Sequence, residues 1–332
     1  MAGIVGNPDL RLFALSESGD LGTRMASHLG ITLADHEERS FDDGEHKARP
    51  LENVSNRDVF VVQSLYGDDN LSVNDKLVRL LFFLGSLKDA AAARITAVLP
   101  YLCYARKDRR TKSRDPLATR YIAQLIEAVG TDRILALDVH NPAAFENAFR
   151  RTAYHLTART LFVEHFAPLL KEPPVVVSPD VGGAKRAEAF RQLLGRRLGS
   201  EPGSAFLEKY RSGGEVTGQA VVGEMEGRTV IVIDDMVSSG GTLVRAARAC
   251  RDHGAARIYA AATHGLFTGD AATTLNDPAL DALVVTDSIP PFRLDGTAAR
   301  DKLAVLDVAP MLAHAVGRVH EGGSIQKLMG ME

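Results

Sequence analysis

The chain has 332 residues, of which 45% are hydrophobic and 24% are charged, close to the averages for soluble globular proteins. Its length allows two domains of ordinary size, and its formal net charge of -3 argues against a general nucleic-acid-binding protein, which is usually basic. Two distant cysteines, Cys103 and Cys250, argue against a disulfide framework, and neither a signal peptide nor a bilayer-length apolar run is found. We therefore expect a cytoplasmic protein with no nucleic-acid or membrane partner.

Short β-branched segments alternate with longer helical patterns along the chain, as in proteins built from parallel α/β units. The predicted strands lie at 59–64, 94–102, 133–139, 175–180, 229–235, 257–264, 282–288 and 303–308. The predicted helices lie at 74–87, 117–128, 183–194 and 242–253. Because the strands are almost continuously apolar, we expect them to be buried on both faces, as parallel strands are.

Three segments share one pattern: AAARITA at 91–97, GTDRILA at 130–136 and GAARIYA at 254–260 each join a predicted helix to a strand through Arg-Ile-x-Ala. Such loops can arise independently, because glycine often ends helices. The alternative, which we favour, is a pair of similar α/β domains in tandem. We place the N-terminal domain at 1–152 and the C-terminal domain at 153–332, with a tail at 311–332 that can pack back on the first.

The stretch at 195–228 is rich in glycine and charge and has no clear periodicity. It predicts a long loop, and loops of that length inside a compact unit are usually functional or mobile.

Two adjacent acids, Asp234 and Asp235, end the predicted strand at 229–235, in the sequence VIVIDDMVSSGGTL. Ligands of open parallel sheets bind beyond the carboxyl ends of the strands. The loop that follows can surround a phosphate with backbone N–H groups and hydroxyls at a helix N-terminus; it consists of Ser238, Ser239, Gly240, Gly241 and Thr242. Adjacent carboxylates suit ribose hydroxyls or hydrated Mg²⁺. We therefore predict a phosphorylated sugar here, rather than an ordinary strand-to-helix turn with a serine cap.

This segment resembles the phosphoribosyl diphosphate signature of type I phosphoribosyltransferases and of ribose-phosphate diphosphokinases, which are also called ribose-phosphate pyrophosphokinases or phosphoribosyl diphosphate synthetases. The usual pattern is two acids, two spacers, Asp-Thr, a spacer and Gly-Thr. Ser238 stands here in place of the third acid, and Ser239 in place of the threonine. Some diphosphokinases, archaeal ones among them, carry a similar Ser-Thr-Gly-Gly-Thr loop. The departure counts against any mechanism that needs a carboxylate at position 238.

The sequence FDDGE at 41–45 is similar to the diphosphokinase segment that holds adenine. The resemblance implies that Phe41 stacks on the base and that Asp43 and Glu45 contact its edge. An acidic glycine turn is common in proteins, so the segment gains its meaning from the other motifs.

The sequence YARKDRRTKSR at 104–114 has six basic residues in the nine positions 106–114. A solvated loop is the usual interpretation of a charge run, but this one follows a strand end, and polyphosphates need such charge. It resembles the nucleotide segment Tyr-Ala-Arg-Gln-Asp of the diphosphokinases, which implies ATP contacts from Arg106, Lys107 and Asp108. Lys107 replaces the usual glutamine.

Two further strand ends carry candidate metal ligands. In LDVHN, Asp138 and His140 are two residues apart and are expected to point the same way on an extended strand. The resemblance implies that they hold the Mg²⁺ of Mg-ATP. In SPDVGGAKRA at 178–187, Asp180 precedes two glycines, and the resemblance implies that it contacts either a second metal through water or the ribose. No Walker A loop is found in the sequence.

The sequence FLEKYRSGG at 206–214 reads as a surface loop by composition. In the resembling family a mobile loop with Lys-x-Arg closes over the transferred diphosphoryl group. The resemblance therefore implies catalytic roles for Lys209 and Arg211, which would neutralise the charge that develops on the phosphates.

These motifs occur in the family's order, and the tail HEGGSIQKLM is similar to the end of bacterial members. The chain is identified as a member of the ribose-phosphate diphosphokinase family. The resemblance implies an α/β fold of two tandem type I phosphoribosyltransferase-like domains, each a mainly parallel sheet flanked by helices. ATP would bind segments of the first domain, and ribose 5-phosphate would bind the second.

The implied reaction transfers the diphosphoryl group of Mg-ATP to the C1 hydroxyl of ribose 5-phosphate, giving 5-phosphoribosyl 1-diphosphate and AMP. The family also implies a homo-oligomer built on dimers, of which a hexamer is one form, with adenine contacts from a neighbouring subunit. Two alternatives stay open. A phosphoribosyltransferase would need neither FDDGE nor the basic loop. A non-catalytic regulatory homologue would tend to lose Lys209 and Arg211, which are present here, so we prefer the enzyme; the changes at Ser238 and Lys107 keep the regulatory homologue open.

Overall fold

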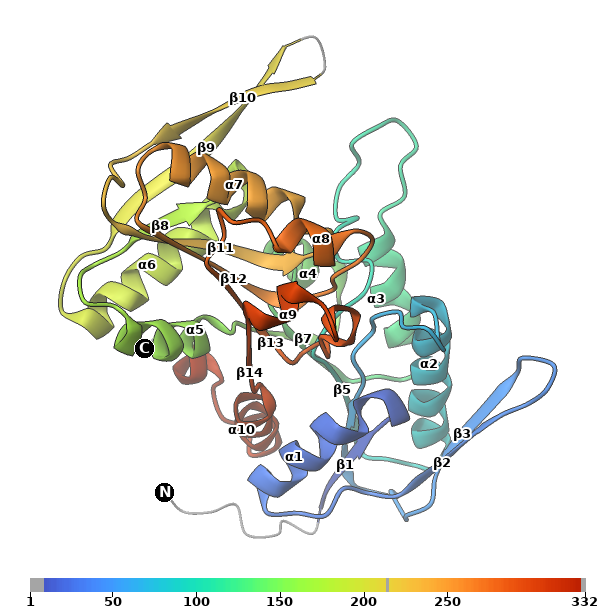
Figure 1. The fold of residues 1–332 in the computed structure, drawn as a ribbon. Helices are drawn as coiled ribbons and strands as arrows, with labels where there is room; N and C mark the ends of the chain where they lie inside the picture. Colours follow the sequence, from blue (N-terminus) through green and yellow to red (C-terminus); the bar gives the residue numbers. More distant parts are fainter. Residues whose placement is uncertain (1–8, 213–214, 330–332) are drawn as a thin grey trace. The chain divides into compact units, whose positions relative to one another are not determined.

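The computed structural model describes residues 9–212 and 215–329, without the side chains of residues 208–222, Lys327 and Met329 (Figure 1). The chain divides into two compact α/β units. The first unit comprises Met1–Thr157 and Val308–Glu332, and the second comprises Ala158–Asp307. The C-terminal segment that follows the second unit therefore belongs to the first.

The first unit is built on a five-stranded parallel sheet with the order β1-β4-β5-β6-β7. Its strands are β1 (Leu10–Ala14), β4 (Asp58–Val62), β5 (Arg94–Leu99), β6 (Arg133–Leu137) and β7 (Thr152–Leu156). A separate antiparallel hairpin consists of β2 (His36–Ser40) and β3 (His46–Pro50). The helices are α1 (Gly19–Leu29), α2 (Val73–Asp89), α3 (Ala118–Ala128), α4 (Pro142–Ala148) and α10 (Ala309–His320), with short 3-10 turns at Ser16–Ser18 and Gln326–Met329.

The second unit is built on a seven-stranded sheet with the order β10-β9-β8-β11-β12-β13-β14, in which only the β9–β10 pair is antiparallel. Its strands are β8 (Val175–Ser178), β9 (Gly203–Ser212), β10 (Glu215–Val222), β11 (Thr229–Val237), β12 (Arg257–Gly265), β13 (Ala282–Thr286) and β14 (Leu303–Leu306). The helices are α5 (Arg159–Phe166), α6 (Ala184–Leu198), α7 (Gly241–Asp252), α8 (Ala271–Leu275) and α9 (Ala298–Asp301), with 3-10 turns at Ala167–Leu169, Val181–Gly183 and Phe292–Leu294.

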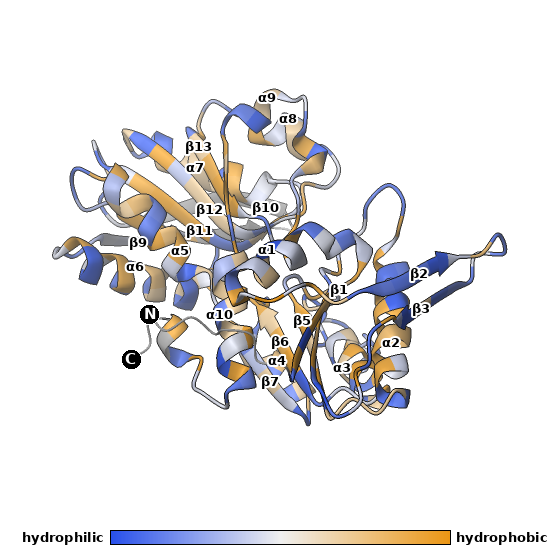
Figure 2. Cartoon of the chain, turned by 90° about the horizontal axis from the view of Figure 1, so that it is seen from below, coloured by the Kyte–Doolittle hydropathy of each residue, from blue (hydrophilic) through white to orange (hydrophobic). Residues whose placement is uncertain are grey.

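Every strand and helix predicted from the sequence is present, with ends that differ by a few residues. The central strands are buried apolar segments, drawn mainly in orange in Figure 2, and this continuous burial explains why they can be predicted. The prediction of a long loop at 195–228 is wrong, because α6 continues to Leu198 and an antiparallel pair of strands, β9 and β10, follows it. Strands at a sheet edge mix polar and apolar residues and leave no continuous apolar run.

A pair of hydrogen bonds recurs in the two sheets at the repeated Arg-Ile-x-Ala segments. In the first unit the Ile95 amide donates to the Asp132 carboxylate, and the Asp132 amide donates to the Ile95 carbonyl, both at 2.9 Å. In the second unit Ile258 and Asp281 form the same two bonds, at 2.6 and 3.0 Å. The recurrence favours two similar domains in tandem over independent loops.

The amino ends of the central strands in the first unit converge on Asp58, whose side chain is buried. Its carboxylate accepts hydrogen bonds from Arg94 Nη2 (2.7 Å), Arg133 Nη2 (2.8 Å) and the imidazole Nδ1 of His320 (2.8 Å). His320 is the last residue of α10, which also packs against α1. The helix α10 is thereby attached to the sheet that residues 10–156 form.

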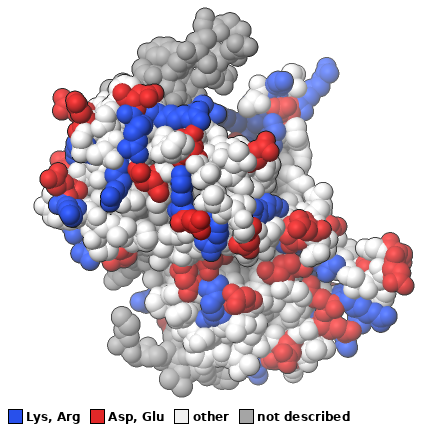
Figure 3. All heavy atoms as spheres, in the orientation of Figure 1, with Lys and Arg blue, Asp and Glu red and all other residues white. Residues whose placement is uncertain are grey.

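On the face drawn in Figure 3, basic and acidic side chains are interspersed, in keeping with the small formal net charge of -3. In the part of the chain that the structure describes, no helix combines the length and the apolar character needed to cross a membrane.

Candidate functional site

The strand order of the second unit reverses between β8 and β11, because the chain runs outward from β8 through β9 and β10 before it returns. Ligands of open α/β sheets bind at such a reversal, beyond the carboxyl ends of the strands. Asp180 follows β8, and Asp234 and Asp235 lie near the carboxyl end of β11. The sheet therefore brings three acids predicted from the sequence to one edge of the second unit.

The adjacent acids of β11 are largely buried and share a cation. The side chains of Asp234 and Asp235 are 18% and 4% exposed, and Arg186 Nη1 from α6 lies 3.3 and 3.6 Å from one oxygen of each. Burial raises the pKa of Asp234 to about 8, and a hydrogen bond and charge repulsion from Asp235 act in the same direction, whereas Arg186 opposes the rise. At neutral pH the pair therefore holds a proton that ionised acids in water would have lost.

Sequence reasoning missed Arg186, although it lies in the quoted segment SPDVGGAKRA. A usable signal was its place in the first turn of a helix, where the helix dipole disfavours a cation unless an anion lies nearby.

The loop at 238–242 has a fixed backbone. Ser238 Oγ is hydrogen-bonded to Thr268 Oγ1 at 2.8 Å, and the Thr268 amide donates to the Ser238 carbonyl at 3.0 Å. Gly240 has a φ of +81°, and a Cβ there would lie 2.8 Å from Leu275 Cδ2. Because α7 begins at Gly241, the unpaired N–H groups of its first turn border this loop. The arrangement suits an anion, and the binding of a phosphate here stays a prediction.

Asp180 stabilises the turn in which it lies by accepting two hydrogen bonds. Its Oδ1 accepts a hydrogen bond from the Gly183 amide at 3.1 Å, and its carbonyl accepts one from Ser178 Oγ at 2.6 Å. Whether Asp180 serves a metal or the ribose stays a prediction.

In the first unit, FDDGE forms the tip of the β2–β3 hairpin, which projects beside α2 in Figure 1. The Phe41 amide donates to the Glu45 carbonyl at 2.8 Å, and Asp43 Oδ1 accepts from the Glu45 amide at 3.0 Å. Phe41 is 38% exposed, and the Arg39 guanidinium carbon lies 5.0 Å from the centre of its ring. An exposed ring at a hairpin tip can stack on a planar base.

The basic loop between β5 and α3 is exposed but ordered by one acid. Asp115 accepts hydrogen bonds from the hydroxyl and amide of Thr111 and from the Lys112 amide, and Lys107 Nζ lies 3.4 Å away. The Thr111 hydroxyl is the largest cause that lowers the pKa of Asp115 to about 2. Asp115 therefore stays ionised at all ordinary pH values and keeps the loop folded.

Asp108 of this loop accepts a hydrogen bond from Asn141 Nδ2 at 2.6 Å. Asn141 caps α4 and follows directly after the predicted metal ligands Asp138 and His140. The structure thus brings two predicted segments, 104–114 and 137–141, into contact within the first unit.

The expectation that Asp138 and His140 continue an extended strand is wrong. β6 ends at Leu137, and Asp138 has a φ of +38°, a conformation that costs a non-glycine residue about 1–2 kcal/mol. The Asp138 amide donates to the Leu156 carbonyl at 2.8 Å, which holds the turn in place. Asp138 is buried and His140 is exposed, so the two side chains do not share a strand face. Their joint binding of a metal stays a prediction.

Lys209 and Arg211 belong to β9 by backbone and lie opposite Gln219 and Val216 of β10. Their side chains lie outside the described part of the chain, so their catalytic roles stay predictions.

Two mainly parallel α/β units, with an acid-bearing strand end and a glycine loop in the second, define a protein of the phosphoribosyltransferase-like class. A model for the N-terminal domain of ribose phosphate pyrophosphokinase matches residues 10–130, and a model for the phosphoribosyl synthetase-associated domain matches residues 214–330. The chain therefore belongs to the ribose-phosphate pyrophosphokinase family.

Individual relatives agree over nearly the whole chain. It is 38% identical over 321 residues to a ribose-phosphate pyrophosphokinase of Caldanaerobacter subterraneus, covering 96% of this chain and 97% of the relative. It is 37% identical over 327 residues to one of Haemophilus ducreyi, covering 97% and 99%. A crystal structure of phosphoribosylpyrophosphate synthetase from Mycobacterium smegmatis has a TM-score of 0.82 at 33% identity and covers 95% of this chain and 100% of that chain. The family and the fold class expected from the sequence are confirmed.

Proposed function

We propose that the chain is an ATP-dependent diphosphotransferase that moves the diphosphoryl group of Mg-ATP to the C1 hydroxyl of ribose 5-phosphate. The products are 5-phosphoribosyl 1-diphosphate and AMP. The observation that carries the proposal is the pair Asp234 and Asp235 two residues before the glycine loop, in a chain of this family. Ribose 5-phosphate offers hydroxyls to the acids and a phosphate to the loop N–H groups.

Catalysis in this proposal is positioning together with electrostatic stabilisation, as is usual for phosphoryl transfer. Asp234 and Asp235 orient the ribose by accepting hydrogen bonds from its hydroxyls, and the loop at 238–242 holds the 5-phosphate. The C1 hydroxyl loses its proton to solvent as its oxygen forms a bond to the β-phosphorus of ATP, and the bond from that phosphorus to the oxygen that bridges it to the α-phosphorus breaks, so that AMP leaves with that oxygen. Lys209 and Arg211 neutralise the charge on the transferred group.

ATP is assigned to the first unit. Phe41 stacks on adenine, Asp43 and Glu45 contact its edge, and Arg106, Lys107 and Asp108 line the phosphates. The exposure of the Phe41 ring and of the basic loop supports this assignment.

Mg²⁺ is the proposed metal. Asp138 would offer Mg²⁺ a carboxylate, the protein ligand that this ion prefers, and His140 would add an imidazole, with nucleotide phosphates and water as further ligands. The bound ion neutralises phosphate charge. Asp180, on the second unit, contacts either a second ion through water or a ribose hydroxyl.

We also propose a homo-oligomer, built on dimers, in which the hairpin tip with Phe41 serves the adenine site of a neighbouring subunit. Light scattering of the purified protein tests this, because a monomer would contradict it. Both cysteines are buried free thiols, and this supports the proposed cytoplasmic location, because thiols stay reduced in the cytosol.

Identification of the nucleotide product tests the function. The purified protein is incubated with Mg-ATP and ribose 5-phosphate, and AMP is expected in step with phosphoribosyl diphosphate. ADP as the product would mean γ-phosphoryl transfer and would overturn the mechanism. Bound ATP without any product would favour the regulatory homologue.

A further inference from the structure

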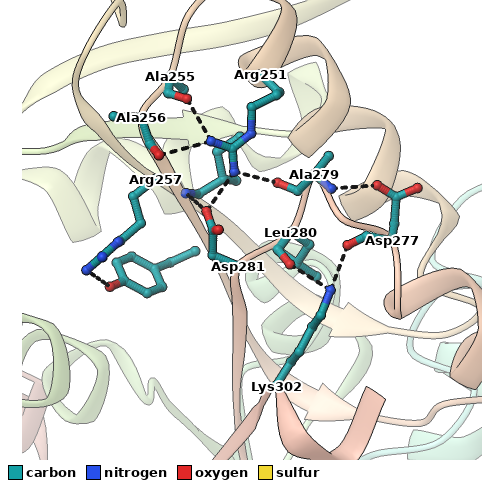
Figure 4. A network of polar contacts seen from close by, with 11 residues as sticks. Arg251, Ala255, Ala256, Arg257, Asp277, Ala279, Leu280, Asp281 and Lys302 are labelled. Atoms are coloured by element: carbon teal, nitrogen blue, oxygen red, sulfur yellow. Dashed lines mark hydrogen bonds and ion pairs between the residues drawn. The ribbon is translucent and has the colours of Figure 1, made fainter. Parts of the chain in front are cut away.

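Helix α7, which begins at the glycine loop, carries three arginines at intervals of three residues. Arg248 Nη2 is paired with Asp277 Oδ2 at 2.5 Å. Arg251 Nη2 is paired with Asp281 Oδ2 at 2.8 Å (Figure 4). Arg245, the arginine next to the loop, makes one side-chain hydrogen bond within the described residues, from Nη2 to Thr242 Oγ1 at 3.2 Å, and it has no carboxylate partner there. Two of the three charges are therefore neutralised by acids, and the third is not.

The Arg245 guanidinium lies over the first turn of its helix, because helical side chains lean towards the N-terminus. Its Nη1 is 3.2 Å from the place that a Cβ on Gly241 would occupy, so the glycine leaves room for it. Thr242 and Gly241 are both residues of the loop at 238–242. The cation thus borders the same loop as the unpaired backbone N–H groups.

This position is electrostatically unfavourable for an arginine as long as the loop holds no anion, because the N-terminus of a helix already carries partial positive charge. A phosphate in the loop reverses the sign of that interaction. It would accept hydrogen bonds from the helix N–H groups and from the guanidinium, whose planar fork matches two phosphate oxygens.

We propose that Arg245 binds the 5-phosphate of ribose 5-phosphate and makes the site specific for the phosphorylated sugar. This inference rests on the proposed function. Arg186 lies at the acids and Arg245 at the loop, so one cation stands near each part of the sugar-phosphate site.

The test compares Arg245→Gln and Arg245→Lys with Arg248→Gln, a matched control on the same helix. The measurements are KM for ribose 5-phosphate and for Mg-ATP from AMP release, and the thermal stabilisation that ribose 5-phosphate gives without nucleotide. Loss of a charge-assisted contact should raise KM for ribose 5-phosphate about tenfold in Arg245→Gln and less in Arg245→Lys. Thermal stabilisation should fall in the same order. In both Arg245 variants, KM for Mg-ATP and kcat should stay at the wild-type values. In the Arg248→Gln control, KM for ribose 5-phosphate and the thermal stabilisation should also stay at the wild-type values.

Salt adds a readout that a purely structural role would not change. In the wild type KM for ribose 5-phosphate should rise with ionic strength, and in Arg245→Gln this rise should be smaller, because one screened charge is gone.

The outcomes separate the two proposals. A wild type that ribose 5-phosphate neither stabilises nor converts overturns both. An active wild type with an unchanged KM in Arg245→Gln overturns the role of Arg245 alone. If Arg245→Gln raises KM for Mg-ATP instead, the guanidinium binds the nucleotide. If Arg248→Gln raises KM for ribose 5-phosphate as much as Arg245→Gln does, the effect comes from the general surface charge. Either result contradicts the proposal.

Discussion

The ionisation of the acid pair on β11 depends on Arg186, and the substitution Arg186→Met tests that dependence. Methionine keeps much of the apolar stem and removes the charge. Arg186 Nη1 lies 3.3 Å from Asp234 and 3.6 Å from Asp235, and the three side chains are 23%, 18% and 4% exposed. The substitution therefore takes the cation from two largely buried carboxylates.

The size of the effect follows from these distances. Two unit charges about 3.5 Å apart interact by about 5 kcal/mol at an effective dielectric constant of about 20. Desolvation offsets part of this energy, and a cation at such a distance typically lowers a carboxyl pKa by about 1–3 pH units. Burial and Asp235 already raise the pKa of Asp234 to about 8 in the presence of Arg186. Without Arg186 the pKa should lie about 1–3 pH units higher.

The sign of the pH dependence is fixed by what the acids do. An ionised carboxylate accepts hydrogen bonds from both neighbouring ribose hydroxyls, so binding should strengthen as pH rises through the pKa of Asp234. In the wild type, KM for ribose 5-phosphate should therefore fall as the pH is raised towards about 8. In the variant, the same fall in KM should occur at higher pH. At pH near 8 the variant's KM should be about tenfold higher or more, because each pH unit corresponds to about a factor of ten.

The assay is the initial rate of AMP release as a function of ribose 5-phosphate concentration, over a series of pH values. Arg186→Lys, which keeps the charge, should restore most of the wild-type profile. Arg197→Met is the control on the same helix, since Arg197 is exposed and paired with Glu164 at 3.5 Å. A profile in Arg186→Met with the wild-type midpoint would refute the argument.

Three further predictions concern Lys209 of β9, the turn at Gly240 and the buried Asp58. Lys209→Ala should abolish AMP release while ATP binding persists, and retained turnover would refute its catalytic role. Gly240→Ala should destabilise the protein by about 2–3 kcal/mol in thermal unfolding, because of its φ of +81° and the contact with Leu275. Gly227→Ala, with a φ of +68° and open space around it, should cost only about 1 kcal/mol, and equal losses would contradict the packing argument. Asp58→Ala should cost about 3–5 kcal/mol in denaturant unfolding, because it removes the carboxylate that neutralises largely buried arginine and histidine side chains, and a loss below about 1 kcal/mol would refute this.

The parts of the site that the sequence predicts are local in the chain. Asp234, Asp235 and the loop at 238–242 form one unbroken segment, and a buried strand followed by glycines at a helix start determines their position. The same holds for the central strands, whose continuous apolar runs need no tertiary information. These features are visible because each is encoded by neighbours within one turn or one strand.

The parts that the sequence does not predict depend on packing or on a single backbone angle. Arg186 is 48 residues away from Asp234 in the sequence, and the packing of α6 on the sheet brings the two side chains together. The same packing places Arg186 next to Asp235. The turn at Asp138 depends on a positive φ that no residue pattern announces at an aspartate. The β9–β10 pair depends on hydrogen bonds at a sheet edge, where composition resembles that of a loop.

The attachment of α10 to the first sheet has a consequence for how the protein is made. His320 bonds to Asp58 across 262 residues, so the amino ends of β4, β5 and β6 lack this partner until the ribosome has synthesised α10. The second unit, Ala158–Asp307, is one uninterrupted stretch and can complete its sheet earlier. The first unit, which begins earlier in the sequence, is therefore completed after the second. A chain truncated before residue 308 would contain a complete second unit and an incomplete first unit.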